Sequence, residues 1–143
     1  MAVYNSGSID EYVRVIITKS WGKGGTNLNL ATIQLGILTD NGWIIDNNAT
    51  TDARVILYYR HVLERGKESP PFMDSIKIDP SIQREYEVIK NGNNITIANK
   101  YDDSSFHIDV EVNAVQTHSA PEAIETAWGV KVSVDENGTL TLL

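Results

Sequence analysis

The residue types best suited to chemistry gather on one strand-like segment, residues 106–115. His107, Asp109 and Glu111 alternate there with apolar residues, and alternate side chains of a strand share one face about 6–7 Å apart. Imidazole and carboxylate groups are common metal ligands, so these three residues are the candidate metal site. The spacing is too wide for one ion unless a neighbouring strand adds ligands. We therefore expect a solvated sheet face here, with no bound metal.

Catalytic and cofactor-binding motifs give no stronger candidate. The chain has no cysteine, which excludes thiolate metal sites and cysteine nucleophiles, and no Gly-x-Ser-x-Gly elbow occurs. The glycine-rich loop from Trp21 to Gly25 lacks the Gly-x-x-x-x-Gly-Lys frame of a phosphate-binding loop and leads into a strand-like run. We expect no enzymatic activity and no cofactor. Trp21 and Lys23 remain candidates for contact with a partner.

Charge is distributed unevenly along the chain. Lys and Arg number 12 and Asp and Glu number 19, a formal net charge of −7. Before Pro71 there are seven basic and seven acidic residues; the remaining five basic and twelve acidic residues follow it. This balance argues against binding of nucleic acid or an anionic membrane, which requires a basic surface. A cationic partner fits better, and Asp102, Asp103 and Glu111 are its candidate contacts.

Three Asn-Gly pairs predict β-hairpins. They are Asn41-Gly42, Asn91-Gly92 and Asn137-Gly138, and each lies between strand-like runs. Asn and Gly both tolerate the positive φ that two-residue hairpin turns require. The predicted hairpins join residues 28–38 to 43–45, 86–89 to 94–98, and 130–134 to 139–142.

Two further strands and one or two helices complete the prediction. Residues 12–18 are rich in β-branched types, and residues 106–115 alternate between apolar and polar. Ser119 to Glu122 matches a capping box with proline in the first turn, which predicts a helix over Ala120–Trp128. The segment Ala53–Arg65 has helical periodicity but strand-like composition. We favour a helix because the periodicity is specific, and the strand remains the alternative.

Length and composition fit one soluble domain over residues 1–143, with residues 1–10 as a flexible N-terminal arm. We expect an α+β fold that is mostly antiparallel β, a sandwich- or barrel-like sheet built from the three hairpins. No apolar run is long enough to span a membrane, and no signal peptide is recognisable. The expected location is a virion or the cytoplasm.

Two segments carry a resemblance to known proteins. Tyr12-Val-Arg-Val-Ile-Ile-Thr18 and Leu30-Ala-Thr-Ile-Gln-Leu35 resemble the closing strands of discoidin-type (coagulation factor 5/8 type C) carbohydrate-binding β-sandwiches. Similar segments also occur in phage tail proteins. The two segments lie within residues 12–35, about a sixth of the chain, and the resemblance implies a β-sandwich. It transfers no site residues, because no matching ligand loops are present.

Three functional hypotheses follow. The first is a non-enzymatic structural protein, such as a phage tail, capsid or baseplate accessory component, acting through subunit interfaces as a homo-oligomer or larger assembly. The second is an acidic immunity- or inhibitor-type protein that binds a basic partner. The third is a carbohydrate-binding module, for which Trp21, Tyr58 and Tyr101 are the candidate exposed aromatic residues.

Overall fold

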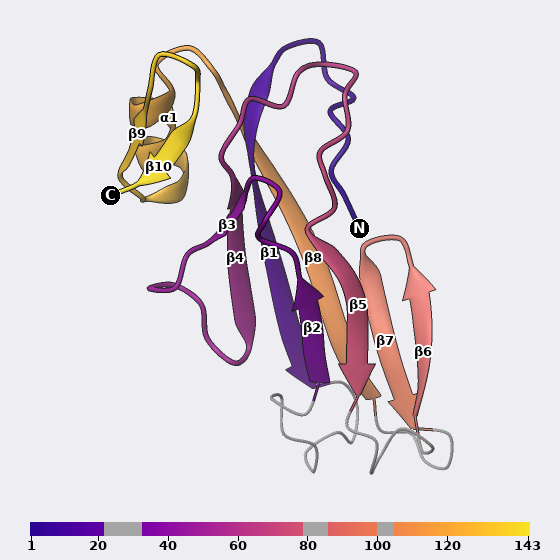
Figure 1. Cartoon of the computed structure of the whole chain (residues 1–143). Coiled ribbons are helices and arrows are strands. Elements are labelled where there is room, and N and C mark those ends of the chain that lie inside the picture. The colour runs from indigo at the N-terminus through magenta and orange to yellow at the C-terminus, as the bar shows by residue number, and fades with distance from the viewer. Residues whose placement is uncertain (22–32, 79–85, 100–104) are drawn as a thin grey trace.

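A six-stranded antiparallel sheet forms the centre of the computed structural model, which describes residues 1–21, 33–78, 86–99 and 105–143 (Figure 1). The strand order is β3-β4-β1-β8-β7-β6. The long strands β1 and β8 pair along their whole length, from Glu11 opposite Gln116 to Trp21 opposite Phe106. The strands of this sheet are β1 (Glu11–Trp21), β3 (Trp43–Ile45), β4 (Arg54–Tyr59), β6 (Tyr86–Asn91), β7 (Asn94–Asn99) and β8 (Ser105–Gln116).

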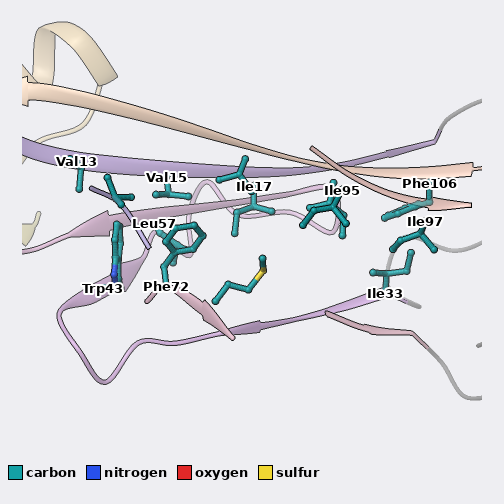
Figure 2. Close-up of a cluster of buried hydrophobic side chains, with 14 of the residues drawn as sticks. Val13, Val15, Ile17, Ile33, Trp43, Leu57, Phe72, Ile95, Ile97 and Phe106 are labelled. Atoms are coloured by element: carbon teal, nitrogen blue, oxygen red, sulfur yellow. The ribbon is translucent and has the colours of Figure 1, made fainter. Parts of the chain in front are cut away.

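A second layer, made of β2 (Ile33–Ile37) and β5 (Met73–Ile78), pairs antiparallel and covers one face of the large sheet, here called the inner face. Alternation along β1 directs Val13, Val15 and Ile17 to this face, where they are at most 1% exposed. Side chains of both layers form the main hydrophobic core (Figure 2). It includes Ile33, Trp43, Leu57, Phe72, Met73, Ile95, Ile97, Phe106 and Ile108.

A smaller C-terminal unit covers the opposite, outer face at one end of the sheet. It consists of α1 (Ala120–Trp128), β9 (Val132–Val134) and β10 (Leu140–Leu142), and β9 pairs antiparallel with β10. Tyr12 of β1 joins its separate hydrophobic cluster and donates a hydrogen bond to the Gly138 carbonyl at 2.6 Å. This end of the sheet is therefore packed on both faces, and among the described residues the other end is packed on the inner face alone.

The helix predicted over Ala120–Trp128 is confirmed, but its predicted capping box does not form. Ser119 has φ 51° and makes no side-chain cap hydrogen bond. The other end is closed by Gly129, with φ 71°, whose N–H donates to the Glu125 carbonyl. The helix begins where Pro121 and Glu122 favour a first turn, and it ends at a left-handed glycine.

The helix favoured for Ala53–Arg65 is wrong, because residues 54–59 form strand β4. Val55, Leu57 and Tyr59 face the main core, whereas Ile56 and Tyr58 lie on the outer face. Ile56, Leu57 and Tyr58 are all at least 94% buried. Because both faces of β4 are covered, its apolar residues do not alternate with polar residues. Their spacing in the sequence therefore resembles the periodicity of a helix.

The hairpin predicted around Asn41-Gly42 is also wrong. β2, before this turn, pairs with β5, and β3, after it, pairs with β4. β6 and β7 do pair with each other across Gly92 and Asn93, and β9 pairs with β10 across the turn that contains Gly138. The barrel-like alternative fails as well, since β3 and β6 end the large sheet without closing it in the described part of the chain.

The first half of residues 1–10, the segment predicted to be a flexible N-terminal arm, is packed into the fold. Val3 joins the main core, and Asn5 is only 1% exposed. The Asn5 side-chain amide donates to the carbonyls of Ile9 and Leu63, each at 2.9 Å. The Phe72 backbone N–H donates to the Met1 carbonyl at 2.8 Å. Hydrogen bonds to distant residues, which a local reading of the sequence does not reveal, hold this segment.

Across the described ranges, no helix combines the length and the apolar character needed to cross a membrane.

Candidate interaction surfaces

The three candidate metal ligands lie in a row on the outer face of β8 and do not converge. His107 packs between hydroxyl groups, with Nδ1 3.1 Å from Thr96 Oγ1 and Nε2 3.4 Å from Ser105 Oγ. Asp109 and Glu111 are exposed. Among the described residues, no three His, Cys, Asp or Glu side chains are grouped closely enough to hold a metal ion. The row is a solvated sheet face with an acidic end.

The remaining predicted contact residues have different positions. Trp21 is the last residue of β1, and Lys23, Tyr101, Asp102 and Asp103 lie outside the described residues. Tyr58 was expected to be exposed, and that expectation is wrong, because its side chain is 1% exposed. Its ring lies 5.8 Å from that of Trp128. Trp128, which covers Tyr58, belongs to the C-terminal unit and lies 70 positions later in the sequence.

An aromatic and cationic cluster that the sequence did not predict fixes α1 to the sheet. The Arg14 guanidinium lies 5.0 Å from the centre of the Trp128 ring, a cation–π geometry. The same group donates two hydrogen bonds to Asn113 Oδ1, at 3.1 and 2.8 Å. Burial raises the pKa of Tyr58, while Arg14 acts against that shift. This cluster has a structural role, because its side chains hold α1 against the large sheet.

The edge strand β6 is the most exposed strand of the large sheet. Every residue from Glu87 to Asn91 is exposed, and among them Val88 is 43% and Ile89 48% exposed. Within the described ranges, β6 pairs with β7 on one side and with no strand on the other. Glu87 and Lys90 flank the two aliphatic residues. An unpaired edge with adjacent aliphatic side chains is a surface suited to strand pairing.

A second unpaired edge lies on β8. β7 pairs with β8 only from Ser105 to Asp109, and the Val110 N–H donates to the Asn93 carbonyl where the pairing ends. The β6–β7 hairpin turns back at this point, so β8 continues toward α1 with β1 as its one paired strand in the described part of the chain (Figure 1). Val112 is 40% exposed there.

An open groove of about 750 Å³ borders the other edge strand, β3. Asp46 and Lys131 are charged residues of its lining. Asp46 Oδ1 already accepts the backbone N–H groups of Asn48 and Ala49, at 3.1 and 3.3 Å. A carboxylate used in this way organises a turn.

Comparison of the chain with protein-family models, with curated proteins and with solved structures found no match. The unpaired edges of β6 and β8 are therefore the features that indicate a function.

Proposed function

We propose that this chain is a non-enzymatic structural protein that assembles through subunit interfaces, and that β6 is the strand through which two copies pair. The observation that carries the proposal is the exposure of Val88 and Ile89, 43% and 48%, on an edge strand. Natural edge strands that stay monomeric are commonly protected by proline, bulges or inward charges. β6 contains no proline and pairs with β7 without a register shift. Its one charge on the inner face, Lys90 opposite Ile95, is exposed and lies near the end of the strand.

The backbone of β6 favours pairing with a second copy. The hydrogen bond from the Val110 N–H to the Asn93 carbonyl shows which residues of β7 direct their backbone groups to β8. Successive residues of a strand direct these groups to opposite sides. The free N–H and C=O groups of Val88 and Lys90 therefore lie on the open edge of β6. An antiparallel pair of β6 strands has a two-fold axis normal to the sheet, so the Val88 side chains of the two copies gather on the inner face and the Ile89 side chains on the outer face. Glu87 and Lys90 give this edge one charge of each sign.

Within this class we propose a virion component, such as a phage tail, capsid or baseplate accessory protein, with its two strand layers acting as a β-sandwich. Support comes from the antiparallel, strand-dominated fold, from the absence of a catalytic motif in the sequence, and from the short resemblance of two segments to phage tail proteins. The alternative location is the cytoplasm.

The alternative functions differ in their support. An acidic immunity- or inhibitor-type protein is favoured by the exposed carboxylates of Asp109 and Glu111, which have the sign that attracts a basic partner. The carbohydrate-binding hypothesis loses one of its three aromatic candidates, because Tyr58 is buried. It now depends on Trp21 and Tyr101, and full glycan binding by a Trp21→Ala variant would remove its main support.

Light scattering at low and high salt tests the assembly proposal. We expect a mass that is a multiple of 15.9 kDa and resists salt, because the contact is made by aliphatic side chains and backbone hydrogen bonds. Ile89→Lys should reduce the mass to that of a monomer. Ile9→Lys is the matched control, since Ile9 is 55% exposed on a different surface, and it should leave the mass unchanged. A wild-type monomer at every concentration would refute the proposal.

A further inference from the structure

We propose that the α1 end of β8, residues 111–116, binds an extended basic segment of a partner protein as an added strand. β8 has 12 residues, and the pairing with β7 covers Ser105 to Asp109. From residue 111 to 116, no strand pairs with the edge of β8 opposite β1 within the described parts of the chain. The proposal does not rest on pairing through β6, because it uses another strand and another kind of partner.

Backbone geometry leaves the hydrogen-bonding groups of this edge free. The N–H of Val110 points toward β7, since it donates to Asn93 at 3.0 Å. In an antiparallel ladder, alternate residues direct both N–H and C=O to the same side. Val112, Ala114 and Gln116 therefore direct these groups to the open edge, whereas Glu111, Asn113 and Val115 direct theirs to β1. An incoming strand would find a row of free donors and acceptors.

Side chains along this edge select the sequence of the incoming strand. Val112, 40% exposed, and Ala114 lie on the inner face, so the residues opposite them should be apolar. Glu111 lies exposed on the outer face, and a residue opposite it should carry positive charge, because directly opposed unlike charges stabilise a strand pair. The chemistry that fits is alternation of apolar residues with Lys or Arg.

Charge distinguishes this partner from a second copy of the chain. β8 contains two acidic residues and no Lys or Arg, and no ion pair is formed by Asp109 or Glu111 within the described residues. β6, in contrast, carries Glu87 and Lys90. The free segment carries one charged side chain, Glu111, and the Arg14 guanidinium on the same face is already held by Asn113 and Trp128. A second copy, with net charge −7, is therefore the less favoured occupant. A basic segment would be attracted to this edge, and the hypothesis of a basic partner thereby gains a defined site.

The test uses a fluorescently labelled peptide of about six residues, the length of the free edge, with alternating Val and Lys. We expect it to bind at low salt, and we expect a matched Val-Glu peptide to bind at least about tenfold more weakly. Hydrogen exchange measured by NMR should show new protection at the amides of Val112 and Ala114. The Asn113 amide, which faces β1, should not change.

Ala114→Pro is the decisive variant. It removes an N–H that β1 does not use, so the fold should persist, and proline is tolerated on such an edge. We expect at least about a tenfold loss of affinity for the Val-Lys peptide, whereas Ala114→Thr, which keeps the N–H, should bind like the wild type. No binding by the wild type, binding without amide protection, or unchanged affinity in a folded Ala114→Pro variant would each overturn the proposal. Performing the test in the Ile89→Lys background separates its failure from failure of the β6 interface.

Discussion

Two regions of the large sheet are built differently. Around β1 and β4, both faces are covered, by the β2–β5 layer on the inner side and by the α1 unit on part of the outer side. At β6, every residue from Glu87 to Asn91 is exposed. Burial of apolar side chains stabilises the folded state. The exposed aliphatic residues of β6 contribute little to that stability. The difference indicates that the covered region maintains the fold and that the open edge is available for contact.

The largest expected effect comes from the covered region. Leu57 of β4 is fully buried between the two layers. Leu57→Ala should lower the free energy of unfolding by about 2–5 kcal/mol, because it removes buried methyl groups and leaves a cavity. Urea unfolding followed by circular dichroism measures this. A loss below about 1 kcal/mol would show that the inner core is less tightly packed than the structure indicates.

A smaller loss is expected where the C-terminal unit meets the sheet. Trp128→Ala removes the ring that contacts both Tyr58 and Arg14, and we expect a loss of about 2 kcal/mol. Trp128→Phe keeps an aromatic face and should recover part of this. Urea unfolding of the two variants beside Arg14→Ala measures the coupling. Additive effects of Trp128→Ala and Arg14→Ala would contradict a direct interaction between these side chains.

Alkaline pH should also weaken the covered region. Burial raises the pKa of Tyr12, Tyr58 and Tyr59 above their ordinary value of 10.0. As the pH rises through this value, the unfolded chain releases these protons first, so the free energy of unfolding falls above about pH 10. Burial lowers the pKa of Lys19, which has the opposite effect just below its ordinary value of 10.5. Because three tyrosines act against one lysine, we expect the free energy of unfolding to fall on balance.

Urea unfolding across this pH range checks the sign of the effect. Tyr59→Phe should make the decline shallower, since burial alone raises the pKa of Tyr59. Stability that is constant or increases above pH 10 would contradict the burial of these phenol groups.

The smallest change in stability is expected at the open edge. Ile89→Ala should alter the free energy of unfolding of the monomer by only about 0.5 kcal/mol, because nearly half of the side chain is exposed. Unfolding of dilute samples, in which a weak dimer dissociates, isolates this value. A loss comparable with that of Leu57→Ala would mean that β6 is part of the stabilising core.

Sequence reasoning succeeded where local patterns decide the structure. The alternation over residues 106–115 located β8, and the strand-like run 12–18 located the middle of β1. The proline and glycine signals located α1. It failed where distant contacts decide, as in β4, whose two covered faces hide the strand period, and in Tyr58, which Trp128 covers.

The open edges could not be predicted for the same reason. Whether a strand is central or at an edge depends on the order of strands, and β1 pairs with β4 and β8, which are distant in the sequence. The acidic character of Asp109 and Glu111 was visible in the sequence, but the end of the β7 pairing beside them was not.

Amide hydrogen exchange as a function of protein concentration tests the central claim most directly. The amides of Val88 and Lys90 face the open edge of β6, and that of Ile89 faces β7. If two copies pair through β6, protection of Val88 and Lys90 should rise with protein concentration while that of Ile89 stays constant. Fast exchange of Val88 and Lys90 at every concentration would contradict the assignment of β6 as the assembly strand.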